Sequence, residues 1–304
     1  MKIDIVFIIG PSEKLHPLGL PKFQLPFLNV PLLNLSVNYI TPIASKIFLV
    51  CLKNQTSTII QMLKDCKIPY EIIETPSYEG MAYNLNSLQK KITSQYFIMC
   101  KGDIYGQEPL RPMLEGFILS NDDVYASLER TTSNGLTLSL DSSNRLIGFQ
   151  ENRIPFIKNT KMRVTTEFIF KDFFIIRTSS LGKLDNSLYG FKNNVIPHLI
   201  KNKVRIRVGE NSIFQVRNFK NYTKQIDFKN TILGLSDGTE YNLIDNECDI
   251  SEDSHVENSI IGGNVTIEGK TSIISSVIMK NAILTEGQRY ERCIVDSNSN
   301  TYKY

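Results

Sequence analysis

The chain has 304 residues, 41% of them hydrophobic and 21% charged, and its 34 basic and 31 acidic residues leave a net charge of +3. This length suffices for one large and one small globular domain. The small charge excess, without any run of five Lys or Arg, excludes a nucleic-acid-binding footprint. The apolar start at residues 5–9 is too short for a signal-peptide core or a membrane span, so we expect a cytoplasmic protein with no direct nucleic-acid or membrane partner.

Cysteine and histidine are too sparse to build a metal or disulfide framework. The three histidines lie far apart in the sequence, and no two cysteines form a Cys-x-x-Cys pair. The five cysteines are Cys51, Cys66, Cys100, Cys248 and Cys293. We therefore expect neither structural zinc nor disulfides.

The first hundred residues alternate between apolar runs and helix-like stretches. Buried strands are predicted at residues 3–9, 45–52, 70–73 and 96–100, and helices at 32–40, 56–66 and 83–92. This alternation is typical of βαβ units, so the fold class is α/β, Rossmann-like, with a mainly parallel sheet. Ligands of such sheets bind beyond the carboxyl ends of the strands, where Gly10 and Asp103 are expected.

The middle of the chain has a different pattern. Short strands separated by turn residues, at residues 124–191, predict a β-rich subdomain inserted in the α/β domain. A helix at 193–201 and a strand at 204–208 return the chain to the first sheet. Residues 227–246 lack periodicity, so we expect a first domain over 1–230 and a linker over 231–246.

The tail, residues 247–304, repeats an aliphatic residue about every six positions. Ile250 and Val256 are six apart, and after a slip of one residue Ile261, Ile267 and Ile273 continue the period, followed less strictly by Ile278, Ile283 or Leu284, Tyr290 and Ile294. Hexads of this kind predict a left-handed parallel β-helix with the aliphatics stacked inside. Glycines 262, 263, 269 and 287 would suit its corners. A short antiparallel β module with glycine turns is the alternative.

The N-terminal motif carries a family resemblance. Gly10-Pro11-Ser12-Glu13-Lys14-Leu15 and the following Pro21-Lys22 to Leu33 are similar to the signature of the nucleotide-sugar pyrophosphorylases, whose glycine-rich loop binds phosphate. The second half matches well. In the first half only Gly10 remains of the loop glycines, Pro11 can donate no N–H, and Glu13 adds negative charge where phosphate should lie.

The same resemblance implies two magnesium carboxylates. Lys101-Gly102-Asp103 matches the first, but Gln215 stands where the second is expected, and a neutral amide is a poor substitute for a hard anionic oxygen. Asn152 replaces the sugar-phosphate lysine, and Met81 a nucleotide-contact threonine. The resemblance thus implies a vestigial nucleotide pocket at Gly10, Lys14, Lys22, Gly80 and Asp103, with no catalytic residue, no bound metal, no cofactor and no enzymatic activity.

The tail, from Ser259 to Gly287, resembles the repeats of the gamma subunits of eukaryotic translation initiation factor 2B. That resemblance implies a non-catalytic subunit of a guanine-nucleotide exchange complex, with an epsilon-type subunit, the other subunits and initiation factor 2 as partners. Two alternatives remain. One is an active nucleotide-sugar pyrophosphorylase similar to mannose-1-phosphate guanylyltransferases, and the other is a regulatory protein that only binds a sugar nucleotide.

Overall fold

The computed structural model describes residues 2–10, 14–76, 85, 88–106, 109–131, 135–151, 163–164, 168–183, 194–232 and 241–304. The chain divides into two compact units. The first, here called the sheet unit, comprises Met1–Pro11 and Ser36–Gln215; the second, the β-helix unit, comprises Ser12–Leu35 and Val216–Tyr304. An N-terminal segment therefore belongs with the C-terminal tail.

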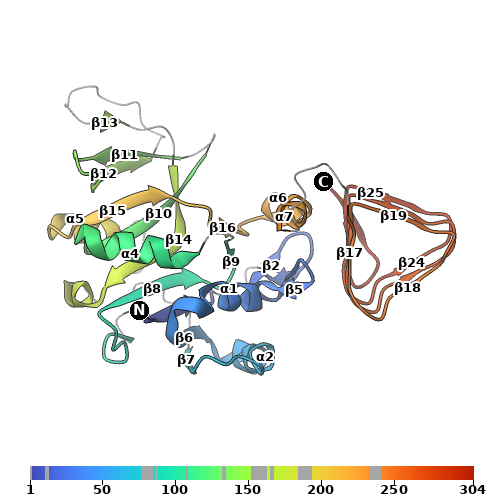
Figure 1. The fold of residues 1–304 in the computed structure, drawn as a ribbon, viewed down its shortest axis with the longest axis horizontal. Helices are drawn as coiled ribbons and strands as arrows, with labels where there is room; N and C mark the ends of the chain where they lie inside the picture. Colours follow the sequence, from blue (N-terminus) through green and yellow to red (C-terminus); the bar gives the residue numbers. More distant parts are fainter. Residues whose placement is uncertain are drawn as a thin grey trace. The chain divides into compact units, whose positions relative to one another are not determined.

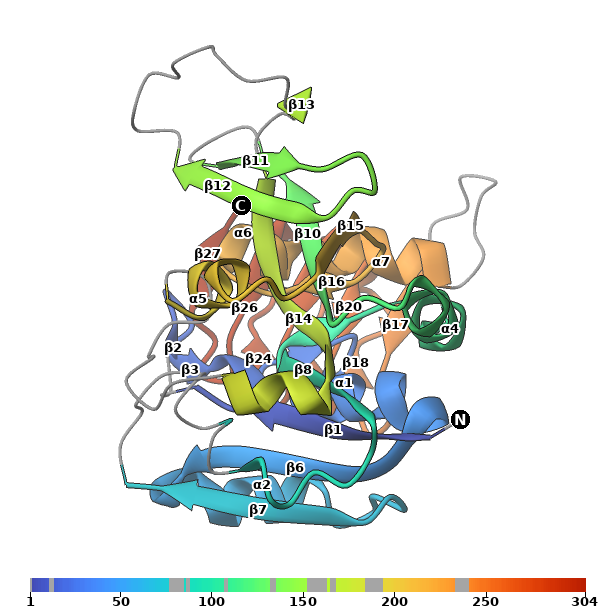
Figure 2. The ribbon, with the colours of Figure 1, turned by 90° about the vertical axis from the view of Figure 1, so that its left-hand side faces the viewer.

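A ten-stranded mixed sheet forms the sheet unit, in the order β12-β11-β14-β8-β1-β6-β7, with β10 pairing with β14 and β15, and β13 with β11. Its strands are β1 (Ile3–Ile8), β6 (Ala44–Leu52), β7 (Tyr70–Thr75), β8 (Tyr96–Lys101), β10 (Val124–Arg130), β11 (Leu136–Leu140), β12 (Leu146–Glu151), β13 (Arg163–Val164), β14 (Phe168–Arg177) and β15 (Ile206–Glu210). Figure 2 shows the order as a ladder from β7 at the bottom to β11 and β12 at the top.

Strand β1 lies at the centre of the parallel part of this sheet. It pairs in parallel with β6 on one side and β8 on the other, and all six of its residues are buried. A strand covered on both faces takes mostly apolar residues, which explains the apolar run at residues 5–8. The exception is Asp4, whose buried carboxylate accepts hydrogen bonds from Ser45 and from the N–H groups of Thr93 and Ser94. The predicted strands here are present, and the α/β fold class is confirmed.

The described residues of this part of the chain include the α-helices α1 (Leu32–Ile40), α2 (Thr56–Met62), α4 (Leu110–Ser120) and α5 (Ile196–Lys201). Sequence periodicity missed α4, which contains Pro112 and Gly116. Proline is tolerated because it stands in the first turn, where its missing N–H has no intrahelical partner. The helix buries Leu110, Leu114 and Phe117 on one face. Residues 83, 84, 86 and 87 of the helix expected at 83–92 lie outside the described residues.

The sequence predicted an inserted β-rich subdomain in the middle of the chain. In the structure, the described strands of this region belong to the main sheet. Strand β14 pairs antiparallel with β8 and with β10, and β11 joins β14, so these strands extend the same sheet. Phe173 faces Cys100 across the β14–β8 pair. The apolar runs of these strands are short and are interrupted by polar residues, so the sequence alone does not determine which strands pair.

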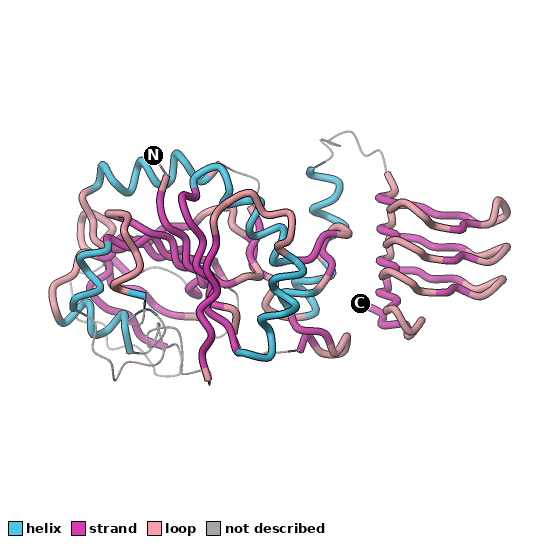
Figure 3. Tube along the Cα trace, turned by 90° about the horizontal axis from the view of Figure 1, so that it is seen from below, coloured by secondary structure: helices cyan, strands magenta, loops and turns pink. Residues whose placement is uncertain are grey.

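The tail forms the predicted left-handed β-helix, seen end-on as a triangle in Figure 1 and as stacked coils in Figure 3. Its strands form three columns, to which β27 is added. They are β17 (Leu243–Ile244), β18 (Asp249–Ile250), β19 (His255–Glu257), β20 (Ile260–Ile261), β21 (Thr266–Ile267), β22 (Ser272–Ile274), β23 (Val277–Ile278), β24 (Ile283–Leu284), β25 (Arg289–Glu291), β26 (Cys293–Val295) and β27 (Thr301–Lys303).

Each coil has 17 residues rather than 18. Leu243 pairs with Ile260, Ile260 with Val277, and Val277 with Ile294, always in parallel. One of the three sides in every coil is therefore a residue short, which explains the slip in the hexad pattern. The interior cluster contains Ile261, Ile267, Ile273, Ile278, Leu284 and Val295, so Leu284 rather than Ile283, and Val295 rather than Ile294, continue the stacked row.

The corners differ from the expectation. Among the glycines assigned to them, only Gly287 has a positive φ. Asn264 and Asn281, 17 residues apart, adopt the left-handed conformation at one corner, since asparagine tolerates it better than most side chains. Gly262 is needed for a different reason, because a Cβ there would lie 2.6 Å from the backbone nitrogen of Lys280 on the next coil.

Two short hairpins from the N-terminal segment complete the β-helix unit, together with helices α6 (Phe219–Thr223) and α7 (Gln225–Ile232). The hairpin strands are β2 (Lys14–Leu15), β3 (Leu20–Pro21), β4 (Pro26–Phe27) and β5 (Val30–Pro31). Helix α7 extends into the stretch 227–246, where the sequence shows no periodicity. Part of the expected linker, 233–240, lies outside the described residues, so its bounds stay a prediction.

The second hairpin is anchored on both the helices and the β-helix. The Phe27 ring packs edge-on against Tyr222 and Phe228, with centroids 6.4 and 5.8 Å away. The amide of Asn29 donates to the carbonyl of Ile261, 2.8 Å away. Leu28 N–H donates to the side chain of Gln225. These contacts connect residues that are about two hundred positions apart in the chain.

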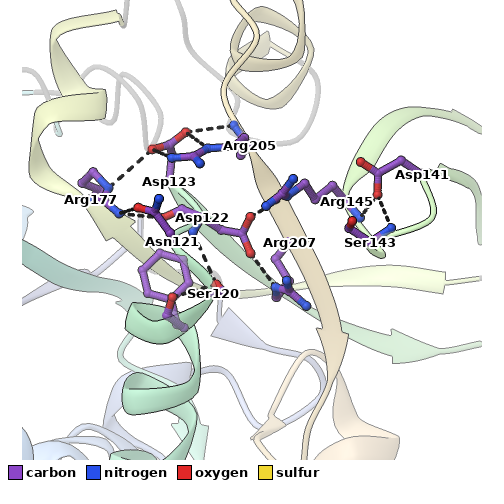
Figure 4. A network of polar contacts seen from close by, with 11 residues as sticks. Ser120, Asn121, Asp122, Asp123, Asp141, Ser143, Arg145, Arg177, Arg205 and Arg207 are labelled. Atoms are coloured by element: carbon purple, nitrogen blue, oxygen red, sulfur yellow. Dashed lines mark hydrogen bonds and ion pairs between the residues drawn. The ribbon is translucent and has the colours of Figure 1, made fainter.

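A network of arginines and aspartates joins β10, β12, β14 and β15 (Figure 4). The fully buried carboxylate of Asp122 accepts from Arg145 Nε at 2.7 Å and Arg207 Nε at 2.5 Å. Asp123 accepts from Arg205, and Arg177 lies 3.4 Å away. Burial raises the pKa of the Asp122 carboxyl, but the hydrogen bonds from Arg207, Ser120 and Arg145 outweigh it and bring the pKa below its ordinary value.

We expect Ile267→Asp to unfold the β-helix or to cost several kcal/mol, because it places an unpaired charge in the interior row. Thermal unfolding followed by circular dichroism measures this. Ile283→Asp is the matched control, since Ile283 is 55% exposed one coil later. Equal stability of the two variants would contradict the interior assignment.

The Asp122 network should make the sheet unit sensitive to acid. Its contribution is complete above the ordinary aspartate pKa of about 3.9 and is lost as the pH falls through the lower pKa of the folded state. Asp122→Asn leaves two guanidinium groups without their carboxylate, so we expect a loss of about 3 kcal/mol at neutral pH and a shallower decline in acid. Urea unfolding from pH 7 to pH 3 measures both, with exposed Asp65→Asn as control. Parallel pH curves for Asp122→Asn and the parent would refute the assignment.

Candidate functional site

The carboxyl ends of β1 and β8 meet at one edge of the sheet. Ile8 is in register with Lys101, so the segments that follow, at Gly10 and at Asp103, leave neighbouring strands at the same edge. This is the edge where doubly wound sheets bind their ligands. The expectation from sequence that these two positions share an edge agrees with the strand register.

Asp103 is held in place by its neighbours along the chain. Ser36 Oγ in α1 accepts from Ile104 N at 3.1 Å and donates to Ile104 O at 2.7 Å. Ile104 and Tyr105 form β9, which pairs antiparallel with β16 (Phe214–Gln215), and this pairing puts Gln215 opposite Ile104. Asp103 is itself only 6% exposed. A buried carboxylate on a doubly anchored loop is pre-positioned for a ligand.

Gln215 lies between two carboxylates. Its Nε2 donates to Asp103 Oδ1 at 3.2 Å and to Asp172 Oδ2 at 3.0 Å, while its Oε1 accepts from Asp172 N at 3.3 Å. Lys101 Nζ lies 3.0 Å from the same oxygen of Asp172. We call these four residues, Lys101, Asp103, Asp172 and Gln215, the site cluster. It combines two negative charges, one positive charge and one amide.

Sequence reasoning missed Asp172. The β14–β8 register sets Phe173 opposite Cys100, which brings the preceding Asp172 level with Lys101. The available signal was the polar pair Lys171-Asp172 inside the otherwise apolar run of β14. Lys171 is buried and donates to Asn211 O at 2.7 Å. A pair of charged residues in a buried strand indicates a polar site, but only the register shows which residues it meets.

The structure does not test whether the other residues of the expected pocket meet the site cluster. Lys14 in β2 and Lys22 in the 3-10 turn Lys22–Gln24 belong to the β-helix unit. Gly80 lies outside the described residues, as do Pro11, Glu13, Met81 and Asn152. The pocket at Gly10, Lys14, Lys22, Gly80 and Asp103 therefore stays a prediction as a set.

The site cluster offers oxygen ligands and no thiol chemistry. Within the described part of the chain, no three His, Cys, Asp or Glu side chains gather into a metal-binding group. Burial, and secondarily the charge of Asp103, raises the pKa of the neighbouring Cys100 thiol well above its usual value, so this thiol is neutral. The two carboxylates are donors for a hard cation such as magnesium, which commonly binds one or two carboxylates and substrate phosphates, whereas the Gln215 oxygen accepts from Asp172 N.

Three comparisons with known proteins bear on this arrangement. A protein-family model described as "GlmU-like, C-terminal hexapeptide" matches residues 237–302. The solved structure of HddC from Yersinia pseudotuberculosis is similar in fold, with a TM-score of 0.59 and 16% identity, and the match covers 74% of this chain and 99% of HddC. The structure of HddC complexed with GMP-PN matches with the same TM-score and identity, over 75% of this chain and 99% of HddC. No curated protein matches the chain by sequence.

These comparisons correct one expectation. The sequence predicted a chain without enzymatic activity, yet over about three quarters of its length, 74%, it shares the fold of HddC, whose structure has been solved with GMP-PN. The physical reason for the error lies in the site cluster. Substitution of a carboxylate by Gln215 does not leave Asp103 alone, because Asp172 brings a second carboxylate to the same amide.

Among the described residues no helix has the length and apolarity needed to cross a bilayer.

Proposed function

We propose that the chain is a sugar nucleotidyltransferase that joins a nucleoside triphosphate, with GTP as the favoured donor, to a sugar 1-phosphate. The observation that carries this proposal is the convergence of Asp103 and Asp172 on Gln215 Nε2 beyond the carboxyl end of β8. The HddC fold and its GMP-PN complex support the choice of a guanine nucleotide. The family model "GlmU-like, C-terminal hexapeptide", which matches residues 237–302, supports a hexapeptide-repeat tail after the proposed catalytic domain.

In the proposed reaction, a phosphate oxygen of the sugar 1-phosphate attacks the α-phosphorus of the nucleoside triphosphate. A new P–O bond forms as the bond between the α-phosphorus and the bridging oxygen breaks, and pyrophosphate leaves. Charge neutralisation and alignment supply nearly all of the rate in such transfers. Magnesium, when bound, would neutralise the triphosphate and fix its geometry.

The chain's own residues divide this work. Asp103 and Asp172 would hold the cation with their carboxylate oxygens, and Ser36 fixes the loop that carries Asp103. The Gln215 amide donates to both carboxylates and accepts from Asp172 N, so it would hold the carboxylate pair together before the cation binds. Lys101 holds Asp172 by an ion pair and adds a positive charge next to the incoming phosphates.

A role in translation initiation is the more specific alternative. The repeats of the tail fit a gamma-type subunit, but neither the family match nor the solved structures extend to that function or to its partners. The proposed association with an epsilon-type subunit rests on the sequence resemblance alone. Co-purification of an epsilon-type subunit with the chain, together with absence of turnover, would favour it over the nucleotidyltransferase.

We expect magnesium-dependent release of pyrophosphate from GTP and a sugar 1-phosphate, with mannose 1-phosphate the first to test. Asp103→Asn and Asp172→Asn should each lower kcat/KM by about a hundredfold or more, because each removes a charged oxygen from the cation. A coupled phosphate assay with pyrophosphatase measures turnover, and EDTA should abolish it.

Asp65→Asn is the control, since Asp65 is exposed at the end of the α2 region. The role of Asp172 is wrong if Asp172→Asn keeps full activity while Asp103→Asn loses it. The function itself is wrong if the parent shows no turnover with GTP, ATP, CTP or UTP and any of several sugar 1-phosphates.

A further inference from the structure

The segment after β1 has an unusual start. Gly10 is followed by Pro11, whose nitrogen carries no hydrogen, so the peptide unit between them offers a carbonyl oxygen and no donor. Phosphate-binding loops work by turning several N–H groups toward the ligand. A carbonyl that faced the phosphates would repel them. The direction of the Gly10 carbonyl therefore matters more here than in a loop of glycines.

The structure fixes that direction with a buried side chain. Gln55 Nε2 donates to Gly10 O at 3.1 Å, and Gln55 Oε1 accepts from Leu52 N at 3.0 Å. Gln55 is only 5% exposed. The amide nitrogen of Gln55 therefore binds the backbone just after β1, and its oxygen binds the last residue of β6. These two strands are parallel neighbours.

The backbone on either side of the Gln55 side chain is also held by hydrogen bonds. Ile9 N donates to Val50 O at 2.8 Å, which holds the last residue before Gly10 against β6. Gln55 occupies the 3-10 turn Lys53–Gln55, directly before α2. At the first residue of that helix, Thr56 Oγ1 donates to Glu74 Oε1 at 2.8 Å. Three strand ends, those of β1, β6 and β7, are therefore tied together around this amide.

We propose that Gln55 is a positioning residue for the nucleotide phosphates. It engages the Gly10 carbonyl and keeps that oxygen from facing the bound triphosphate, which offsets the loss of an N–H at Pro11. This inference rests on the proposed function, because it assumes that a nucleoside triphosphate binds beyond β1. Gln55 does not touch the reacting atoms, so it acts on nucleotide affinity and KM more than on the chemical step.

The chemistry of glutamine and glutamate makes the proposal testable by pH. Gln55→Glu keeps an oxygen for Leu52 N, but an ionised carboxylate can only accept and would face the Gly10 carbonyl as a repulsive partner. When protonated, the same side chain has an O–H that can donate to that carbonyl. Burial favours the neutral form, so the protonation should occur above the ordinary glutamate pKa of about 4.3.

The experiment titrates GTP with magnesium into the full-length parent and variants by isothermal calorimetry between pH 8 and pH 5. At pH 8 we expect Gln55→Glu to bind GTP at least tenfold more weakly than the parent, with the ratio falling at least threefold toward one by pH 5. Gln55→Met, uncharged and without a donor, should bind at least threefold more weakly at every pH. Gln61→Glu, which puts the same charge at an exposed position of α2, should match the parent.

Steady-state kinetics give a second measurement, in which KM for GTP should rise in both Gln55 variants while kcat stays within about threefold. Circular dichroism checks that each variant is folded, and Gln55→Met keeps the test open if Gln55→Glu does not fold. A parent that binds GTP while both folded variants bind it equally well would overturn the positioning role alone. A parent that binds no nucleoside triphosphate would overturn the proposed function, and this inference with it.

Discussion

The parallel pairing of β1 with both β6 and β8 is the constraint on which the rest of the sheet unit depends. Because these three strands run in the same direction, their carboxyl ends must meet at one edge. Gly10, the Gln55 turn and Asp103 come from distant parts of the sequence, yet each follows directly on one of these strands. A slip of one residue in any pair would turn a buried row of side chains to the opposite face and separate these groups.

Charge in the site cluster is shared in a way that moderates an otherwise costly arrangement. Two carboxylates on one amide would repel each other, and each would lose hydration by burial. Lys101 offsets one of them, and Gln215 lies between the two, so that the cluster carries about one net negative charge without a metal. In the proposed reaction, a divalent cation would bind such a site more weakly than a site with three bare carboxylates, and the triphosphate would complete its coordination.

The sequence predicts local features well because burial on both faces leaves a continuous apolar run, as in β1, and stacking leaves a repeat, as in Ile261, Ile267 and Ile273. It does not predict which distant segments meet. Asp172 reaches Gln215 through an antiparallel register, and Asn29 reaches Ile261 across the length of the chain, so neither contact has a local signature. In the sequence, Gln215 shows only that a carboxylate is missing at its own position. The carboxylate that accompanies it, Asp172, lies in a distant strand and meets Gln215 only in the folded chain.

The discontinuity of the β-helix unit has a consequence for how the protein is made. Residues 12–35 leave the ribosome early, but their partners, from Val216 onward, follow only after the whole sheet unit. At a synthesis rate of about 5–20 residues per second, the hairpin with Phe27 waits on the order of ten seconds or more before Tyr222 and Phe228 can cover it. During that time the Phe27 side chain lacks the two aromatic rings that it packs against and is accessible to chaperones. A nascent chain that ends before residue 216 contains neither ring.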